Sequence, residues 1–313
     1  MDFTIETRGL TRRFGQRRAV DDLDLQVPKG SVFGFLGQNG AGKTTTMRLL
    51  LGLIAPSAGE IRMFGEPMRR ELLARTGALV ENQGFYPYLS GRKNLLLLAK
   101  ATGRLPGPAK AVEEALEAVE LRDRGDDRYA SYSRGMKQRL GIAWAILGRP
   151  ELVLLDEPLN GLDPPAVVRI RTLITELAQK HGSTVFLSSH LLHEVEIGCD
   201  RVAIIDRGRL IAQGSVAELI HPERAVLEVS LADPAAAVSI AKELPFVKDA
   251  RVEEKLLVVE LENEKAGELN KALVEKGHVP SALVPRRKTL EELYHTRVAE
   301  SRHVPSLAKG GGM

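Results

Sequence analysis

The stretch GQNGAGKTT at residues 37–45 constrains the fold of this chain more than any other feature. It fits the pattern G-x-x-x-x-G-K-[ST], and it stands between an apolar run, SVFGFL, and a segment with helical composition. Its glycines let the backbone turn its N–H groups around a phosphate, Lys43 reaches the β and γ oxygens, and the Thr44 hydroxyl suits Mg²⁺. The stretch therefore predicts a phosphate-binding loop between a strand and a helix.

Apolar runs alternate with helical patterns from residue 1 to about residue 220. The runs VFGFL, LVLLDEP and TVFLSS are separated by stretches such as TTTMRLLLGL and VVRIRTLITELAQK. This alternation predicts an α/β fold in which helical crossovers cover both faces of a parallel sheet. The stretch RVAIIDRGRLIAQG adds two short strands around a turn at residues 206–208. A polar segment at about 85–128 lacks strand signals and predicts a helical subdomain, which reaches about residue 145 with the helix that follows.

The carboxyl-terminal part, residues 222–300, predicts a small α+β accessory domain. Its order is strand AVLEVSL, helix AAAVSIAKEL, strand VKDARV, strand LLVVEL, helix KAGELNKALVEKG and strand SALVP, which is ferredoxin-like. A final short helix is expected from Thr289, because TLEE forms a capping box with Glu292. Residues 301–313 have little to bury, and we expect a flexible tail. Regulation, support of a dimer and a passive appendage all remain open for this domain, which has no catalytic constellation.

Two further polar clusters follow apolar runs and predict catalytic chemistry. Asp156 and Glu157 end the run LVLLDEP, and the carboxyl ends of parallel strands meet at one edge of a sheet. There Asp156 would hold Mg²⁺ through water, and Glu157 would act as base or orienter for an attacking water. A solvated strand end is the ordinary interpretation of such a pair, but the upstream phosphate loop favours the catalytic one. His190 ends LSSH at the same edge and is a candidate for bonding a γ-phosphate oxygen and the water, although a lone histidine is more often structural.

The stretch SYSRGMKQR at residues 131–139 predicts a helix with Ser133 as its N-cap. Its apolar positions have the spacing of a buried stripe, formed by Met136, Leu140, Ala143 and Leu147. A capped helix presents its backbone N–H groups to an anion. Capped helices are common, so the stretch alone does not say which anion it faces.

In their order along the chain, GQNGAGKTT, YSRGMKQRL, LLDEP, NGLDP and LSSH resemble the motifs of the ATP-binding subunits of ABC transporters. The stretch FYPYLSGRKNL and the added carboxyl-terminal domain, which ends near TLEELY, resemble the drug and bacitracin exporter subfamily. The resemblance covers residues 1–220. It implies a P-loop NTPase fold of ABC type, with a mostly parallel core, an antiparallel β part and the helical subdomain. It also implies ATP and Mg²⁺ as cofactors. The implied ATP contacts of the chain's own loop are Gly37, Asn39, Gly40, Ala41, Gly42, Lys43, Thr44 and Thr45.

The same resemblance implies a head-to-tail dimer in which each nucleotide is enclosed by two subunits. Ser133 and Gly135 would then touch the γ-phosphate held by the partner, which answers the question of the anion, and Asp163 would reach across the interface. Phe14 would stack on the adenine. The implied Mg²⁺ ligands are Thr44, Asp156 and Glu81.

Two positions depart from the family pattern. Arg134 stands where the signature usually has a second glycine, and we expect it to point to solvent rather than to strengthen a phosphate contact. Glu81 stands at the family's glutamine position, while Gln83 follows two positions later. We hypothesise that Glu81 joins the Mg²⁺ shell, with Gln83 as the alternative, and that the loop FYPYL after it meets the permease.

Composition narrows the setting of this activity. The chain has 313 residues, 43% of them hydrophobic, and Cys199 is its only cysteine, which excludes an internal disulfide and fits a reducing cytosol. MDFTIETRGL lacks the apolar core of a secretory signal, and no apolar stretch approaches the roughly 20 residues of a membrane span. The net charge of +3 gives no argument for nucleic acid, so none is expected as a partner.

The resemblance therefore implies an ATPase that powers a separate polytopic membrane permease from the cytoplasmic face of the cell membrane. The expected cargo is a drug, lipid or polysaccharide, and the direction is export. The expected partner is a second ABC subunit, in a homodimer or a heterodimer. One alternative is a soluble ABC ATPase that acts on a macromolecular complex, but such a protein would carry a second nucleotide domain or a long coiled-coil insertion. The other alternative is a kinase, which would have no use for the signature.

Overall fold

A computed structural model of the chain describes residues 2–81, 84–103, 105–220, 224–286 and 289–303. By its contacts the chain divides into two units. One holds the described residues up to Ser215 together with those from Thr296 on, and the other holds Val216–His295.

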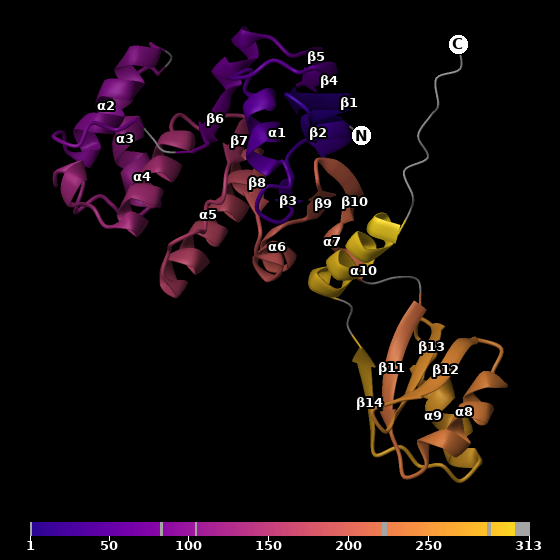
Figure 1. Cartoon of the computed structure of the whole chain (residues 1–313). Coiled ribbons are helices and arrows are strands. Elements are labelled where there is room, and N and C mark those ends of the chain that lie inside the picture. The colour runs from indigo at the N-terminus through magenta and orange to yellow at the C-terminus, as the bar shows by residue number, and fades with distance from the viewer. Residues whose placement is uncertain (1, 82–83, 104, 221–223, 287–288, 304–313) are drawn as a thin grey trace, which may run out of the picture. The chain divides into compact units, whose positions relative to one another are not determined.

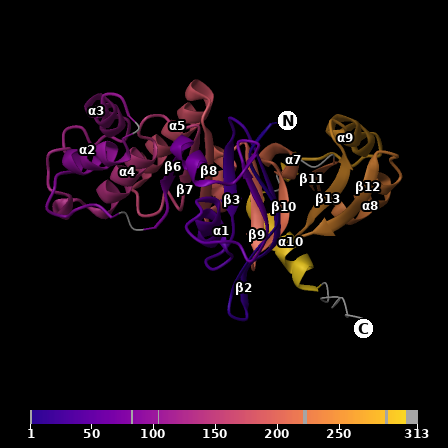
Figure 2. The same cartoon turned by 90° about the horizontal axis from the view of Figure 1, so that it is seen from above.

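A six-stranded sheet in the order β10-β9-β3-β8-β7-β6 runs through the first unit, and Figure 2 shows these strands side by side. All neighbours pair in parallel except β10, which is antiparallel to β9. Strands β3, β7 and β8 are buried along their whole length, as expected of parallel strands covered on both faces. The predicted parallel core and the strand–turn–strand around residues 206–208 are confirmed. The strands are β3 (Val32–Leu36), β6 (Thr76–Leu79), β7 (Leu152–Leu155), β8 (Thr184–Ser189), β9 (Arg201–Asp206) and β10 (Arg209–Ser215).

The predicted antiparallel part is a second sheet in the order β2-β1-β4-β5. It is formed by β1 (Phe3–Phe14), β2 (Arg17–Pro28), β4 (Ala58–Met63) and β5 (Glu66–Pro67). Alternate residues of β1 and β2, such as Leu10 and Leu23, are fully buried in one core with Phe33 and Met47. This shared core fixes the antiparallel sheet and helix α1 (Lys43–Leu50) against the parallel sheet, and so sets the position of the phosphate loop between them.

Three helices form the predicted helical part and lie together to one side of the sheets in both views (Figures 1 and 2). They are α2 (Gly91–Thr102), α3 (Pro108–Ala118) and α4 (Arg134–Ala145), with the 3₁₀ turn η2 (Tyr129–Ser131) before α4. Another 3₁₀ turn, η1 (Arg70–Arg75), precedes β6 and places Leu72 in the core of the sheets. Helix α4 ends before Leu147, which the sequence had placed on its buried stripe. Gly148 follows in a left-handed conformation with Pro150 close behind, and such residues terminate a helix.

Two helices follow the strands that carry the polar clusters. Helix α5 (Pro164–His181) begins at Asp163, whose Oδ1 accepts a hydrogen bond of 3.1 Å from the Ala166 N–H. Helix α6 (Leu192–Gly198) begins just after His190. Both helices therefore start close to the carboxyl edge of the parallel sheet.

The second unit has the expected strand, helix, strand, strand, helix, strand order. Its antiparallel sheet, β12-β13-β11-β14, has one face packed against α8 and α9, with Leu227, Val259 and Leu269 in the shared core. Helix α7 (Val216–Ile220) precedes the sheet. The elements are β11 (Arg224–Ser230), α8 (Pro234–Lys242), β12 (Val247–Glu253), β13 (Leu256–Glu262), α9 (Ala266–Glu275) and β14 (Ala282–Arg286).

The last helix, α10 (Leu290–His303), begins at the predicted capping box. The Glu292 N–H donates to Thr289 Oγ1 over 3.2 Å, and the Thr289 N–H donates to Glu292 Oε2 over 3.4 Å. The predicted final helix is present, and α10 continues to His303, two residues into the segment expected to be a tail. Residues 304–313 lie outside the described residues.

Candidate active site

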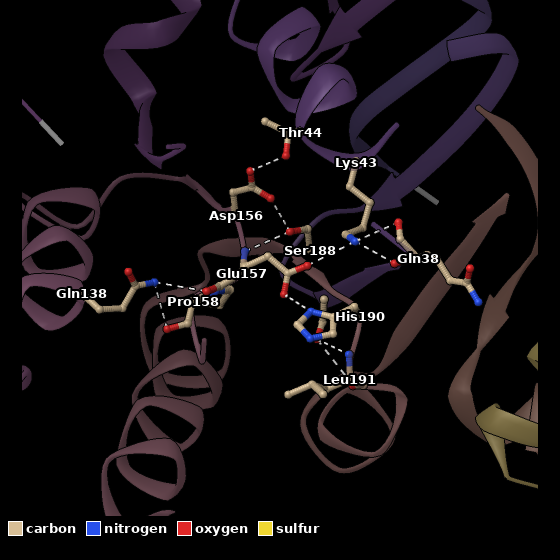
Figure 3. A network of polar contacts seen from close by, with 12 residues as sticks. Gln38, Lys43, Thr44, Gln138, Asp156, Glu157, Pro158, Ser188, His190 and Leu191 are labelled. Carbon is tan, nitrogen blue, oxygen red and sulfur yellow. Dashed lines mark hydrogen bonds and ion pairs between the residues drawn. The ribbon is translucent and has the colours of Figure 1, made fainter. Parts of the chain in front are cut away.

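The polar clusters predicted from the sequence meet at one edge of the parallel sheet. Strands β3, β8 and β7 are neighbours, and the phosphate loop, His190 and the pair Asp156–Glu157 follow their carboxyl ends. Figure 3 shows side chains from these three strand ends converging on Glu157. The edge therefore brings together residues that are more than a hundred positions apart in the chain.

The phosphate loop requires glycine at its last turn. Gly42 has a φ of 113°, and a Cβ built on it would lie 2.4 Å from the carbonyl oxygen of Ala19. The Gly208 N–H donates to the Ala41 carbonyl over 2.8 Å, which fastens the loop to the turn between β9 and β10. The curvature of the loop thus depends on contacts with two other segments.

Lys43 begins α1 and is 6% exposed. Its ammonium donates to the carbonyl oxygen of Gly37 over 2.6 Å and to that of Gln38 over 3.4 Å. The ammonium therefore lies inside the curve of the loop, where a β-phosphate would be cradled.

Asp156 is held on both of its carboxylate oxygens. Thr44 Oγ1 donates to Oδ2 over 2.7 Å, and the Ser188 hydroxyl donates to Oδ1. The same Ser188 oxygen accepts the Glu157 N–H over 2.9 Å. Ser188 is not among the residues predicted for the site, although it stands in LSSH two positions before His190.

Glu157 is the centre of the cluster. His190 Nδ1 lies 2.8 Å from Oε2, and Lys43 Nζ lies 3.2 Å from Oε1. Oε1 is buried and makes no hydrogen bond, so the Lys43 contact is an ion pair only. A neutral imidazole that donates from Nδ1 to the carboxylate keeps Nε2 as an acceptor.

A hollow beside the phosphate loop is lined by six of the eight nucleotide contacts predicted within that loop. Arg17, which the sequence analysis missed, also lines this hollow, and its Nη2 lies 3.5 Å from the Gly40 carbonyl oxygen. Phe14 ends β1, is 46% exposed, and stacks under the Arg12 guanidinium at 4.7 Å. The lining residues are Arg17, Ala19, Gln38, Asn39, Gly40, Gly42, Lys43, Thr44, Thr45 and Glu157.

The signature residues are arranged differently. Ser133 is exposed and caps α4, with Oγ accepting the Met136 N–H over 3.2 Å. Gly135 faces the backbone of Gly161, close to Asp163. Among the described residues, no hydrogen bond or ion pair joins Ser133, Gly135 or Asp163 to the phosphate loop of the same chain.

Glu81 forms an ion pair with Arg48 of α1. It lines a second hollow together with Asp156, Glu157 and the exposed Arg134. Although exposed, the Arg134 side chain lies over Gly161, where a Cβ built on the glycine would come within 2.8 Å of Arg134 Nε. Gln83, the alternative to Glu81, lies outside the described residues.

The oxygen donors at the site fit Mg²⁺. A hydroxyl and a carboxylate, Thr44 and Asp156, are hard ligands, and Mg²⁺ usually takes one or two carboxylates together with waters and substrate phosphates. Within the described ranges no group of three or more His, Cys, Asp or Glu side chains is arranged to hold a metal by itself. The donor set therefore suits an ion that arrives with a nucleotide.

Comparison with known proteins decides the family. The ABC transporter family matches residues 20–160. The bacitracin transport ATP-binding protein BcrA of Enterococcus faecalis is 37% identical over 298 residues, which cover 94% of this chain and 96% of that protein. This chain is an ATP-binding subunit of the ABC transporter family. BcrA of Bacillus licheniformis is 41% identical and covers 94% of this ABC subunit and 97% of its own length, so the relationship extends through the second unit.

A solved structure agrees with the fold of the ABC subunit. The structure of cbiO1 from Clostridium perfringens, part of the ABC transporter complex cbiONQ, has a TM-score of 0.62 and 27% identity, covering 70% of this chain and 91% of that one. The ABC subunit is an ATPase, and subunits of its family dimerise and work with a membrane permease. In the part of the chain that the structure describes, every helix is too short or too polar to cross a bilayer.

Proposed function

We propose that this ABC subunit binds ATP with Mg²⁺ between its own phosphate loop and the signature helix of a second copy, and that hydrolysis drives a permease that exports a drug, lipid or polysaccharide. One observation carries the proposal. The Glu157 carboxylate lies between Lys43 and His190, while within the described residues no hydrogen bond or ion pair joins Ser133, Gly135 or Asp163 to that phosphate loop. A complete site then needs these residues from another subunit.

The side chains divide the chemistry among them. Lys43 and the loop N–H groups neutralise the β- and γ-phosphates, and Phe14 and Arg17 border the space for the base and the phosphates. Thr44 and Asp156 would hold Mg²⁺, which supplies charge neutralisation on the phosphates, with Glu81 as a further ligand once it leaves Arg48. Glu157 accepts a proton from the attacking water, and His190 holds the Glu157 carboxylate in place.

The partner contacts are proposed from exposure and charge. Ser133 is exposed at the amino end of a 12-residue helix, where the backbone N–H groups favour an anion. The γ-phosphate of the partner's nucleotide is that anion in the proposal. ATP then joins the two subunits, and its hydrolysis removes the bridge.

The permease is proposed to contact the loop FYPYL and the helical part at 85–128. Tyr86 and Tyr88 are 42% and 69% exposed, and their rings lie 5.7 Å apart. Exposed aromatic pairs of this kind are typical of protein interfaces. Through the permease the subunit would lie at the cytoplasmic face of the membrane. The two relatives named for bacitracin transport favour a drug among the three proposed cargo classes.

The dimer is tested with Glu157→Gln, which removes the base but keeps the size of the side chain. We expect this variant to bind ATP, to release no phosphate, and to elute as a dimer from size exclusion only when ATP is present. The double variant Lys43→Ala, Glu157→Gln is the control and should stay monomeric. A Glu157→Gln chain that is loaded with ATP and remains monomeric would contradict the proposed site.

Transport is tested by affinity purification of the tagged chain from detergent-solubilised cells of its source. Recovery of a polytopic membrane protein at stoichiometric amount supports the permease. Cosedimentation with ribosomes in place of a membrane protein would instead support the alternative, an ABC ATPase that acts on a macromolecular complex.

A further inference from the structure

The backbone of Glu157 is held in an uncommon conformation. Its φ of 49° lies in the left-handed region, which a residue other than glycine adopts only when its surroundings impose it. On one side the Ser188 hydroxyl accepts the Glu157 N–H over 2.9 Å. On the other side Gln138 Nε2 donates to the carbonyl oxygen of Glu157 over 3.1 Å and to that of Pro158 over 3.2 Å (Figure 3).

Gln138 belongs to α4, the helix that Ser133 caps. The Lys137 N–H donates to the Ser133 carbonyl over 2.9 Å, so Ser133 and Gln138 are little more than one helical turn apart in one rigid element. Further along, Leu140 and Ala143 are fully buried. A displacement at the capped end of α4 therefore moves the Gln138 amide as well.

We propose that Gln138 is a positioning residue that ties the catalytic carboxylate to the signature helix. The Gln138 amide fixes the backbone of Glu157, and the backbone in turn aims the Glu157 carboxylate at Lys43 and His190. The coupling of the two sites rests on the proposed dimer. In that dimer, Ser133 of one subunit contacts the nucleotide of one site, while Glu157 of the same subunit serves the other site. Gln138 joins these two residues.

The contact has a strict chemical requirement, because both of its acceptors are carbonyl oxygens. Only a hydrogen-bond donor satisfies them, so a carboxylate at position 138 would lose both bonds and face two like partial charges. Gln138→Glu makes this change at constant size. Gln138→Met removes the donor at similar length without adding charge, and it serves if the first variant does not fold.

The experiment compares steady-state phosphate release by wild type, Gln138→Glu, Gln138→Met and the control Gln179→Glu. Gln179 lies exposed on α5, so the control makes the same chemical change away from the site. We expect kcat to fall about tenfold or more in both Gln138 variants, with the KM for ATP within about twofold of wild type. We also expect a wild-type Hill coefficient above 1 that falls toward 1 in both variants.

Two readouts separate this inference from the proposed dimer. Gln138→Glu introduced into the Glu157→Gln background should still give the ATP-dependent dimer, because Gln138 acts on Glu157 and not on the interface. An unchanged kcat, or a raised KM with kcat retained, would overturn the positioning role. If Glu157→Gln alone stays monomeric, the dimer and the coupling between sites are refuted, while the kcat of the Gln138 variants still decides the positioning role.

Discussion

Nδ1 of His190 lies 2.8 Å from Oε2 of Glu157, and this contact joins the ends of two neighbouring strands, β8 and β7. Lys43 Nζ approaches the other carboxylate oxygen at 3.2 Å. A carboxylate held from both sides needs little reorganisation when it accepts a proton from water. The His190–Glu157 pair therefore contributes orientation as well as charge.

The first prediction follows from this pair. His190→Ala should lower kcat by about 10²-fold or more, because the carboxylate loses one of its two anchors, while nucleotide affinity changes little. His193→Ala is the control, since His193 is exposed on the adjacent helix α6. Phosphate release and binding of a fluorescent ATP analogue provide the two measurements. Equal losses in the two variants would show that the imidazole at position 190 has no special role.

The second prediction concerns the Thr44 hydroxyl, which donates to Asp156 Oδ2 over 2.7 Å. Thr44→Val should raise the Mg²⁺ concentration for half-maximal ATPase activity about tenfold or more, because an oxygen ligand is lost at constant shape. Thr44→Ser keeps the hydroxyl and should stay within about threefold of wild type. Titration of ATPase activity with Mg²⁺ at saturating ATP measures both. An unshifted Thr44→Val titration would remove Thr44 from the proposed metal ligands.

The sequence predicted those parts of the site that depend on strand ends. Apolar runs that end in Asp156, Glu157 and His190 belong to parallel strands, and parallel strands place their carboxyl ends together whatever their separation in the chain. Ser188 and Gln138 were missed, because their roles depend on which hydroxyl and which amide face a particular backbone group. That information arises only when β7, β8 and α4 pack against each other.

The fold shows the same division. The order of elements in the second unit followed from alternation of apolar residues and from turn residues, which are local signals. The predicted stripe of α4 reached Leu147, whereas the helix ends at Ala145, and α10 continues to His303, past the predicted start of the tail. The spacing of apolar residues locates a helix better than it locates its ends. Leu147 keeps the spacing of the buried stripe after the helix itself has stopped.

The third prediction concerns the backbone of the phosphate loop. Gly42→Ala should abolish ATP binding, since its Cβ would lie 2.4 Å from the Ala19 carbonyl oxygen at a φ of 113°. Gly15→Ala in the hairpin between β1 and β2 is the matched control, because its φ of 57° is also positive but no atom lies within 4 Å of the added Cβ. Isothermal titration with ATP, together with circular dichroism to confirm folding, distinguishes the two variants. ATP binding by Gly42→Ala at wild-type affinity would contradict the close approach to Ala19.

The fourth prediction concerns the pH dependence of stability at Asp21, which is 7% exposed. Burial by itself would raise the pKa of the Asp21 carboxyl, but hydrogen bonds from Arg18 and Arg209 outweigh it, so the pKa lies below its ordinary 3.8. A carboxyl whose pKa is lowered by folding stabilises the protein above its unfolded pKa, and this contribution is lost as the pH falls through the folded pKa. Asp21→Asn should thus reduce the free energy of unfolding by about 2 kcal/mol near neutral pH.

Urea unfolding of wild type and Asp21→Asn measures this effect from about pH 7 down to about pH 3. The difference between the two proteins should stay constant above the ordinary pKa of 3.8 and narrow below it. The Asp21 N–H also donates to the Gly208 carbonyl over 2.9 Å, next to the bond between Gly208 and Ala41. If the difference in free energy of unfolding between wild type and Asp21→Asn grew on acidification, the lowered pKa of Asp21 would be contradicted.

The fifth prediction uses Cys199, the only thiol of the chain. Its sulfur faces β3, where a Cβ built on Gly34 would lie 3.2 Å from Sγ. Burial, and then the charge of Asp200, raise the pKa of the Cys199 thiol, so little thiolate forms near neutral pH.

We expect a disulfide exchange reagent to modify the folded protein at least about 10²-fold more slowly than the urea-unfolded chain. The reaction should accelerate in step with the loss of circular dichroism across a urea series, because unfolding removes the packing of Cys199 against β3. Rapid modification of the fully folded protein would show that the thiol is accessible and would refute this packing.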